Sequence, residues 1–382
     1  MKFECTHCGQ RFDGEESMTG QSFSCTSCGK EFTVVAKAAP AAAAEKYSMT
    51  EKAEWRKEDL QKIVHLKEAN DRIMVQLRKA LVGQDQVVRL VMISLFGSGH
   101  CLLMGVPGIG KTLLVSTLSS CLSLKFKRVQ FTPDLMPSDI TGTEVIQEDK
   151  NTGERSFRFL EGPIFTNILL ADEINRTPPK TQAALLEAMQ EHQVTVGGQR
   201  RKLDEPFFVL ATQNPIEQEG TYPLPEAQMD RFMFQVNVGY PKESEEKRIL
   251  DITTSGYKAQ IEAVLAREEI LEFQQLVRKV NIGDDVVDYI LRLVRSSRQS
   301  EAEAPEFIRK WVSWGAGPRA SQYLVIGAKA VAILDGRNEV TRNDVREVAH
   351  AVLGHRIQPN FAAEAEGVTR VKIVDELLNT VT

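Results

Sequence analysis

A glycine-rich segment with one lysine and one threonine is the clearest candidate for chemistry in this chain. The segment GVPGIGKT, residues 105 to 112, fits the spacing G-x-x-x-x-G-K-[ST]. Glycines let backbone N–H groups curl around phosphate oxygens, Lys111 can neutralise the β- and γ-phosphates, and the Thr112 hydroxyl can bind Mg2+. The strand-like CLLM precedes the segment and the helix-like LLVSTLSSCL follows it, which is the context that this motif requires. The sequence therefore predicts a nucleotide-binding loop for ATP and Mg2+.

Two acidic residues, Asp172 and Glu173, follow the apolar run ILLA. We expect Asp172 to reach the Mg2+ that Thr112 binds, and Glu173 to polarise the attacking water. An Asp-Glu pair can also be a solvated loop or a helix cap, but the glycine-rich loop about 60 residues upstream favours the catalytic interpretation. The residues expected to bind the nucleotide are Gly105, Val106, Pro107, Gly108, Ile109, Gly110, Lys111, Thr112, Leu113 and Asp172.

A second candidate site consists of cysteines near the N-terminus. The pattern C-x2-C-x16-C-x2-C predicts one tetrahedral Zn2+ site with the ligands Cys5, Cys8, Cys25 and Cys28. Gly9 and Gly29 follow the two pairs and permit tight turns, whereas His7 lies inside the first pair and is left out of the ligand set. A disulfide or redox pair is the alternative, and the absence of a helix after either pair disfavours it. Cys101 and Cys121 lie in apolar surroundings and are expected in the core.

Length and composition indicate a soluble protein of two or three domains. The chain has 382 residues, of which 42% are hydrophobic and 26% are charged. A net charge of -5 argues against charge-driven adhesion to nucleic acid or anionic lipid. The sequence shows neither a secretory signal nor an apolar run long enough to span a bilayer, so we expect a cytoplasmic protein.

The pattern of apolar residues divides the chain into four parts. We expect a zinc ribbon over 1–35, a low-complexity linker over 36–49, an α/β core over 50–240 and an α-helical lid over 241–382. Helical spacing leads into the core over 50–81. Strand-like runs at 101–104, 128–131, 168–171, 207–211 and 232–236 alternate with helical segments, which predicts a parallel sheet in a three-layer domain.

The lid is expected to be helical because apolar residues recur there at helical spacing. Such runs cover 286–294 and 321–334. Thr341 and Asp344 resemble a capping box, and the helix that they open has an apolar face. That face consists of Val345, Val348, Ala349 and Val352.

Two further segments are expected to form β-hairpins. Residues 144–159 have a turn signal at Asn151, Thr152 and Gly153, and residues 193–203 have one at Gly197 and Gly198. Simple surface decoration is the alternative to a functional role for both.

Five motifs in a fixed order carry a family resemblance. GVPGIGKT, LLADEINR, LATQNP, PEAQMDRF and GPRA resemble the MoxR family of AAA+ ATPases over about residues 55 to 360. Magnesium chelatase ATPase subunits share much of this pattern. The resemblance implies a P-loop NTPase core with a lid, and hairpins that project toward the pore or face of a ring.

The resemblance also implies roles for three residues besides Glu173. Asn214 would be the sensor-1 residue that orients the water, although Asn-Pro is also a common turn former. Arg231 would be an arginine finger that reaches a neighbouring subunit's nucleotide, and Arg319 a sensor-2 arginine that serves its own chain's nucleotide. Either arginine could instead belong to a surface ion pair, for example with Asp230.

The function implied is that of an ATP-driven motor which remodels, activates or assembles a protein partner, including insertion of a metal or cofactor. Such proteins form rings, hexamers being the expected state, and commonly work with von Willebrand factor A domain partners. A nucleic-acid motor recruited through the ribbon is the alternative. Residues 1–35 carry three basic and five acidic side chains, which disfavours nucleic acid and favours docking of a protein. A passive nucleotide-binding scaffold is a third class, which the presence of Glu173 disfavours.

Overall fold

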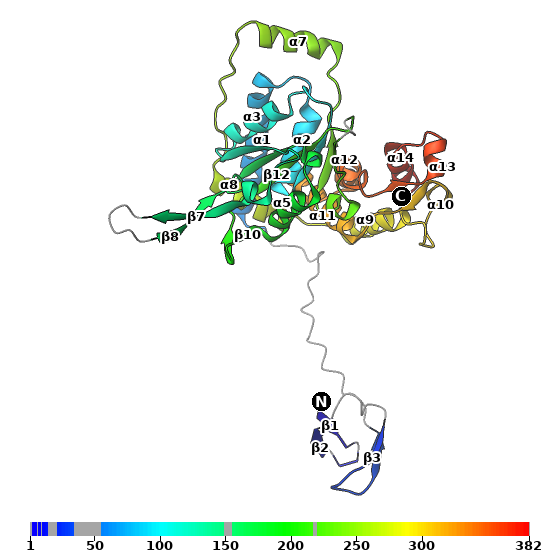
Figure 1. The fold of residues 1–382 in the computed structure, drawn as a ribbon. Helices are drawn as coiled ribbons and strands as arrows, with labels where there is room; N and C mark the ends of the chain where they lie inside the picture. The colour runs from blue at the N-terminus through cyan, green and yellow to red at the C-terminus, as the bar shows by residue number, and fades with distance from the viewer. Residues whose placement is uncertain are drawn as a thin grey trace. The chain divides into compact units, whose positions relative to one another are not determined.

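The computed structural model describes residues 2–5, 7–8, 10–13, 21–33, 55–148, 155–216 and 220–381. The chain divides into two compact units, residues 1–49 and residues 50–382 (Figure 1). The predicted linker over 36–49 and the predicted turn at residues 151–153 lie outside the described residues.

The first unit contains two short antiparallel hairpins. β1 (Lys2–Glu4) pairs with β2 (Arg11–Asp13), and β3 (Ser22–Ser24) pairs with β4 (Glu31–Thr33). The two hairpins have matching turns, because Cys5 N–H donates to the Gln10 carbonyl and Cys25 N–H donates to the Lys30 carbonyl, both at 2.9 Å. In the described part of this unit only the buried Cys5 and Cys25, with Phe12 against them, form a core.

The second unit is built on a parallel sheet of five strands. Their order is β13–β5–β12–β9–β6, and all neighbours run parallel. The bounds are β5 (Cys101–Met104), β6 (Phe126–Gln130), β9 (Ile168–Asp172), β12 (Phe208–Gln213) and β13 (Phe234–Asn237). The predicted parallel α/β core is therefore confirmed.

Two strands differ from the prediction at their ends. β6 begins two residues before the predicted start, at Phe126, and β13 begins at Phe234 rather than at Phe232. The carbonyl groups of Phe232 and Met233 accept hydrogen bonds from the Arg356 side chain of the helical region instead of taking part in the sheet.

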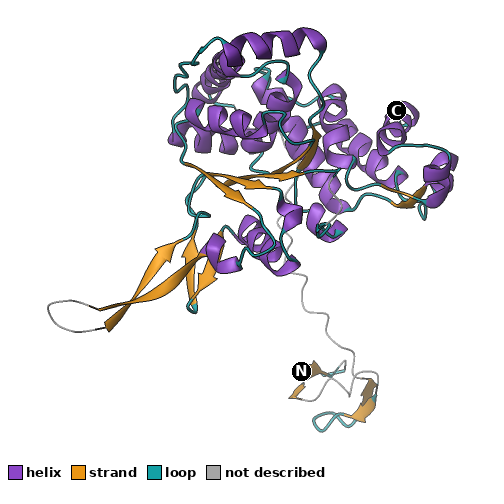
Figure 2. Cartoon of the chain, turned by 45° about the horizontal axis from the view of Figure 1, so that its top comes forward, coloured by secondary structure: helices purple, strands orange, loops and turns teal. Residues whose placement is uncertain are grey.

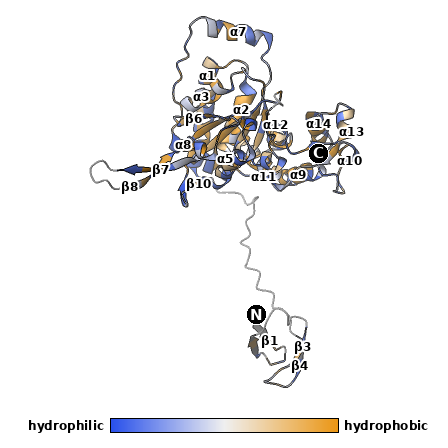
Figure 3. Cartoon of the chain, viewed as in Figure 1, coloured by the Kyte–Doolittle hydropathy of each residue, from blue (hydrophilic) through white to orange (hydrophobic). Residues whose placement is uncertain are grey.

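Helices cover both faces of this sheet, as Figure 2 shows. Successive residues of each central strand enter different cores, because side chains alternate across a strand. Ile168 and Leu170 of β9 belong to the larger core, whereas Leu169 and Ala171 belong to the smaller one. β12 divides in the same way. The central strands are accordingly hydrophobic on both faces (Figure 3), which is typical of a buried parallel sheet.

The helices of the second unit fall before, within and after the sheet. Those up to the last strand are α1 (Lys57–Ala80), α2 (Asp85–Phe96), α3 (Lys111–Cys121), α4 (Pro137–Thr141), the 3-10 helix Ile174–Arg176, α5 (Pro179–Glu191) and α6 (Glu226–Met229). Those after it are α7 (Glu243–Thr254), α8 (Arg267–Lys279), α9 (Asp284–Ser296), α10 (Glu306–Trp311), α11 (Pro318–Leu334), α12 (Arg342–Leu353), α13 (Phe361–Ala365) and α14 (Arg370–Thr380). No helix among the described residues is long and apolar enough to cross a membrane.

Helix α12 of the lid begins with the predicted capping box. The Thr341 backbone N–H donates to the Asp344 carboxylate at 2.7 Å, as in a capping box, and the predicted apolar face of α12 is buried. One feature of the helical region was not predicted. β14 (Val312–Trp314) and β15 (Gln358–Pro359) form a short antiparallel pair.

Both predicted hairpins are present. β7 (Gly142–Glu148) pairs with β8 (Arg155–Glu161), and β10 (Gln193–Val196) pairs with β11 (Gln199–Lys202) through Gly197 and Gly198, at φ 60° and 76°. Arg201 of β11 stacks 3.9 Å over the Phe159 ring of β8 and pairs with Glu144 of β7 at 3.4 Å. The two hairpins are therefore joined at their bases, and β7–β8 projects from the body (Figure 1).

Candidate nucleotide site

The glycine-rich loop connects β5 to α3 at the carboxyl end of the sheet. Gly108 and Gly110 have φ values of 83° and 82°, a region that side chains other than glycine rarely adopt. A Cβ atom at Gly105 would lie 2.8 Å from the Val238 carbonyl oxygen, so this position also requires glycine. Pro107 and Gly108 are exposed. The loop therefore has the turn and the access that a phosphate cradle needs.

Two side chains fix the shape of this loop. Lys111 Nζ donates to the Gly105 carbonyl at 2.6 Å, which holds the ammonium group across the loop. Gln84, which precedes α2, donates from Nε2 to the Ile109 carbonyl at 2.8 Å. Thr112 is half-buried in the first turn of α3, beside Lys111.

Asp172 ends β9 and is held by two neighbours. Its Oδ1 accepts from the Thr212 hydroxyl at 2.6 Å, and its Oδ2 accepts from the Arg128 guanidinium at 2.6 Å and 3.1 Å. Thr212 lies on β12 and Arg128 on β6, the strands on either side of β9. The Asp172 side chain is 11% exposed, so these contacts fix the orientation of its carboxylate in a nearly buried position.

Glu173 has an uncommon backbone conformation. Its φ and ψ are 57° and 49°, the left-handed region that non-glycine residues seldom occupy, and such outliers cluster at functional sites. Its Oε2 accepts from Gln130 Nε2 at 2.6 Å and pairs with Arg176 Nε at 3.1 Å. The turn thus directs the carboxylate out of the line of the strand, and two polar partners hold it.

Asn214 directly follows β12 and is 4% exposed. Its side-chain oxygen accepts from the Ile216 N–H at 3.2 Å, which is the turn-forming contact that Asn-Pro sequences favour. The Gln213 carbonyl beside it accepts from the Gly105 N–H at 3.2 Å. Asn214 therefore follows the strand that contacts the glycine-rich loop.

Arg231 and Arg319 line one cavity of about 200 Å³, together with Tyr323, which lies on the same helix as Arg319. Ser98, Gly99 and His100, which precede β5, also line it. The Met233 N–H donates to the His100 carbonyl at 2.8 Å, which keeps Arg231 near the start of β5. Both arginines thus lie at the amino end of the sheet, whereas the glycine-rich loop lies at its carboxyl end.

This position differs from the expectation that Arg319 serves its own chain's nucleotide. The cause is the packing of α11, whose first turn contacts the segment before β13: Arg319 Nη1 donates to Asp230 Oδ2 at 3.2 Å, and the Tyr323 hydroxyl donates to the Arg231 carbonyl at 3.1 Å. An ion pair with Asp230, which the sequence left open as the alternative to a catalytic role, is thus present for Arg319.

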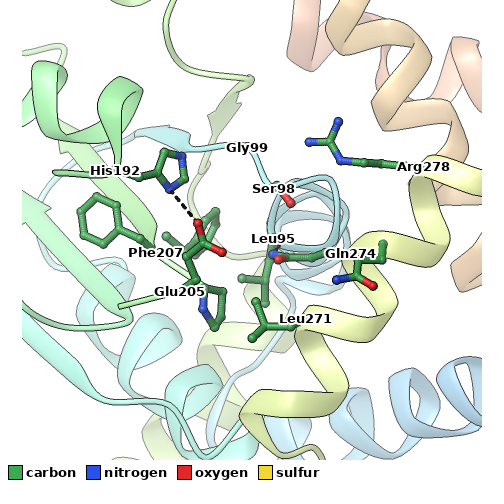
Figure 4. A pocket seen from close by; sticks show the side chains of 12 residues that line it. Leu95, Ser98, Gly99, His192, Glu205, Phe207, Leu271, Gln274 and Arg278 are labelled. Carbon is green, nitrogen blue, oxygen red and sulfur yellow. Dashed lines mark hydrogen bonds and ion pairs between the residues drawn. The ribbon is translucent and has the colours of Figure 1, made fainter. Parts of the chain in front are cut away.

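A second cavity, of about 340 Å³, lies beside the arginine cavity and shares Ser98, Gly99 and His192 with it. Figure 4 shows His192 directed at Glu205, and His192 Nδ1 lies 3.9 Å from Glu205 Oε1. Arg278 of α8 lies on the opposite wall.

His100 is buried between these cavities and the sheet. Its Nδ1 accepts from the Val209 N–H at 3.1 Å, so its Nε2 carries the proton that is donated to the Met189 carbonyl at 3.0 Å. Burial, together with the smaller effect of the nearby His192, lowers the pKa of His100 to about 4, although the hydrogen bond to the Met189 carbonyl acts to raise it.

The four predicted zinc ligands meet in the first unit. The Sγ atoms of Cys5, Cys8, Cys25 and Cys28 all lie within 4.8 Å of one another. The Cys5–Cys28 and Cys8–Cys25 pairs are 3.9 Å and 3.6 Å apart, close to the separation of about 3.8 Å that tetrahedral Zn–S bonds of about 2.3 Å require. Burial opposes ionisation of Cys25, but backbone N–H groups lower its pKa to about 7. His7 Nε2 lies 3.2 Å from the Glu31 carbonyl oxygen. The residues present fit one Zn2+ ion.

Several side chains that surround these groups carry no signal in the local sequence. Arg128, Gln130 and Thr212 contact Asp172 or Glu173 from neighbouring strands, and only the strand order shows that they meet. Each lies at or near the carboxyl end of its strand, a position that identifies them only once the strand order is known.

Comparisons with known proteins agree with this geometry. The family model described as "ATPase family associated with various cellular activities (AAA)" matches residues 100–234, and the AAA lid domain matches residues 308–377. Chaperone MoxR1 of Mycobacterium tuberculosis is 41% identical over 311 residues, which cover 81% of each chain. Protein MoxR of Methylorubrum extorquens is 29% identical, over 82% of this chain and 94% of its own.

Solved structures show the same architecture. A crystal structure of a protein from Cytophaga hutchinsonii has a TM-score of 0.78 and 40% sequence identity, and covers 84% of this chain and 97% of its own. AAA ATPases use ATP and Mg2+, so the predicted ATPase activity and its two cofactors follow from the family. The chain belongs to the MoxR family of AAA+ ATPases.

Proposed function

We propose that this ATPase is a ring-forming motor that remodels or activates a protein partner, with each active site completed by two subunits. One observation carries the proposal: the glycine-rich loop and the arginine cavity lie at opposite ends of the same sheet. A group at the amino end cannot serve the loop of its own chain when a strand of four residues, about 13 Å long, separates the two ends.

Within one subunit, we assign phosphate binding and ATP hydrolysis to different residues. The N–H groups of the loop and Lys111 hold the phosphates, while Glu173 orients the attacking water with help from Asn214. The oxygens of Thr112 and Asp172 are of the kind that Mg2+ prefers, so these residues would hold the ion. When bound there, Mg2+ would supply positive charge that offsets the charge of the phosphates. Arg128 donates a hydrogen bond to Asp172 Oδ2 and orients that carboxylate.

Across the subunit boundary, Arg231 stabilises the charge on the neighbour's transferring phosphate. A planar guanidinium that stays charged is suited to this task. We assign Arg319 to the same boundary, in place of a role in its own chain. Its position in the cavity with Arg231 supports this assignment.

Mixing of inactive variants tests this arrangement. Arg231→Ala subunits retain the pocket and lack the finger, whereas Lys111→Ala subunits retain the finger and lack the pocket. A mixed ring contains some boundaries with both parts intact, so we expect partial ATPase activity to return. Arg319→Ala should behave like Arg231→Ala: it should restore activity with Lys111→Ala, and it should not restore activity with Arg231→Ala.

The outcome of mixing separates the two arginines. If assemblies shown to contain both Arg231→Ala and Lys111→Ala remain inactive, the two-subunit site is wrong. If Arg319→Ala restores activity with Arg231→Ala, then Arg319 serves its own chain.

The partner class rests on family membership and on the ribbon. The relative named Chaperone MoxR1 supports a protein client, for which a von Willebrand factor A domain protein is our first candidate. We propose a hexameric ring in the cytoplasm, with the zinc-bound ribbon as a docking unit for partners. Insertion of a metal or cofactor into the client is one form that the remodelling would take. Capture of proteins on a Glu173→Gln variant in ATP would test the client class, because this variant should remain in the ATP state.

A further inference from the structure

The segment that carries Arg231 is held by the lid along its whole length. The carbonyl groups of four consecutive residues, Asp230 to Met233, accept hydrogen bonds from lid side chains. The Tyr323 hydroxyl of α11 binds the Arg231 carbonyl at 3.1 Å. His355 Nε2 and Arg356 share the Phe232 carbonyl at 3.2 Å and 2.7 Å.

Arg356 makes most of these contacts. Its side chain is 2% exposed, and all five of its N–H donors are used. Nε binds Asp230 Oδ1 at 2.7 Å, and Nη2 binds the carbonyls of Asp230 and Phe232 at 2.8 Å and 2.7 Å. Nη1 binds the carbonyls of Met233 and Val352, the latter in α12. A buried charge with every donor satisfied is costly to displace, because any lost contact leaves a polar group unpaired.

Asp230 links this network to the second arginine of the cavity. Its Oδ1 accepts from Arg356, and its Oδ2 accepts from Arg319 Nη1 at 3.2 Å. One carboxylate therefore orients the guanidinium of Arg319 and, through the adjacent peptide bond, the backbone of Arg231. The two cations of the cavity cannot move independently of the lid.

We propose that Arg356 is a positioning residue that joins Arg231, Arg319 and the lid into one rigid unit. Movement of α11 and α12 then moves both arginines together, toward or away from the neighbour's nucleotide. This inference rests on the proposed two-subunit site and adds the lid as the element that controls it.

Arg356→Lys tests the role because lysine keeps the charge and loses the planar set of five donors. We expect assembled protein to bind ATP with nearly unchanged affinity and to turn it over about tenfold more slowly or worse, since misplacement of a catalytic group lowers kcat. Mixing gives the sharper result. Arg356→Lys should regain activity with Lys111→Ala, and it should not regain activity with Arg231→Ala, because both variants lack a correctly placed finger.

A matched control uses another lid arginine. Arg337 makes two hydrogen bonds to the nearly buried carboxylate of Asp344, and its other hydrogen bonds, to Asp335 and the Glu339 carbonyl, lie away from residues 230–233. Arg337→Lys should lower the thermal unfolding temperature and leave turnover per assembled subunit unchanged. If it slows turnover as much as Arg356→Lys does, general loosening of the lid explains both and the inference fails.

Two further outcomes decide the proposal. If activity recovers when Arg356→Lys is mixed with Arg231→Ala, Arg356 acts in its own chain's pocket and the inference is overturned. The two-subunit site is tested separately: it is still supported if activity recovers when Arg231→Ala is mixed with Lys111→Ala. If Arg356→Lys does not assemble, Tyr323→Phe removes one hydrogen bond to the Arg231 carbonyl and should slow turnover about fivefold. Unchanged turnover in that variant would overturn the inference as well.

Discussion

At the scale of single residues, Lys111 and Glu173 are expected to serve different steps, ATP binding and ATP hydrolysis. Lys111→Ala should abolish ATP binding, because the phosphates lose their cation. Glu173→Gln should retain ATP and stop hydrolysis, because only the orientation of water is lost. Equilibrium binding of a fluorescent nucleotide and release of phosphate measure the two effects. Equal loss of ATP binding in both variants would contradict the role of Glu173.

A second prediction at this scale concerns His100, whose pKa is about 4 in the folded chain against an ordinary value of about 6.5. Between these values only the unfolded chain takes up the proton, so stability falls as the pH falls from about 6.5 toward 4. The loss from pH 7 to pH 5 should be about 2 kcal/mol from this residue.

His100→Asn is the comparison for that prediction, since its amide can both accept and donate a hydrogen bond as the imidazole does. Urea unfolding at the two pH values should show a smaller dependence on pH in the variant, whatever its absolute stability. The same dependence in both proteins would show that His100 is not the group responsible.

Local spacing was sufficient to predict some residues and insufficient for others. The loop, Asp172 and Glu173 follow strands whose apolar residues are evident in the sequence. Gln130, at the end of β6, contacts Glu173 although the two residues are 43 positions apart in the sequence. No local pattern predicts a contact over that separation. Sequence spacing does not reveal against which end of the sheet α11 packs, so it cannot decide which subunit's nucleotide Arg319 serves.

At the scale of elements, the two hairpins of the first unit should bind one zinc ion together. Cys25→Ser should abolish binding, because it removes one of the four thiolates of a single tetrahedral site. Cys121→Ala is the matched control, since that thiol is buried in the second unit and should have no effect on metal content. Metal analysis of purified protein gives the stoichiometry. Retention of one zinc in Cys25→Ser would contradict the ligand set.

The strands were predictable because a buried parallel sheet needs continuous apolar runs, and the sequence has five. Their ends were less predictable: Phe232 and Met233 are as apolar as β13 itself, yet their carbonyls bind Arg356. The pair β14–β15 joins residues about 45 positions apart, so neither strand has a partner signal nearby in the sequence. The ends of the strands and the pairing of β14 with β15 thus depend on contacts between distant segments, which the local sequence pattern does not show.

At the scale of the whole molecule, the division into two units predicts independent activity. Deletion of residues 1–46 should leave ATPase activity within about twofold of the full chain, because every residue to which we assign a role in ATP binding or hydrolysis belongs to the second unit. Steady-state hydrolysis by the purified truncation, with its assembly state confirmed, checks this. A folded, assembled truncation without activity would show that the ribbon takes part in turnover.

The opposite placement of the glycine-rich loop and the arginine cavity also bears on symmetry. A twofold dimer pairs one patch with the same patch of its partner, so its two subunits would exchange arginines only with each other. In the ring that we propose, subunits join head to tail instead, each giving its arginines to one neighbour and receiving them from the other. Such contacts either close into a ring or continue as an open helix, and in an open chain one terminal subunit has a loop without a donor. Closure of the ring, rather than association alone, would make every site complete.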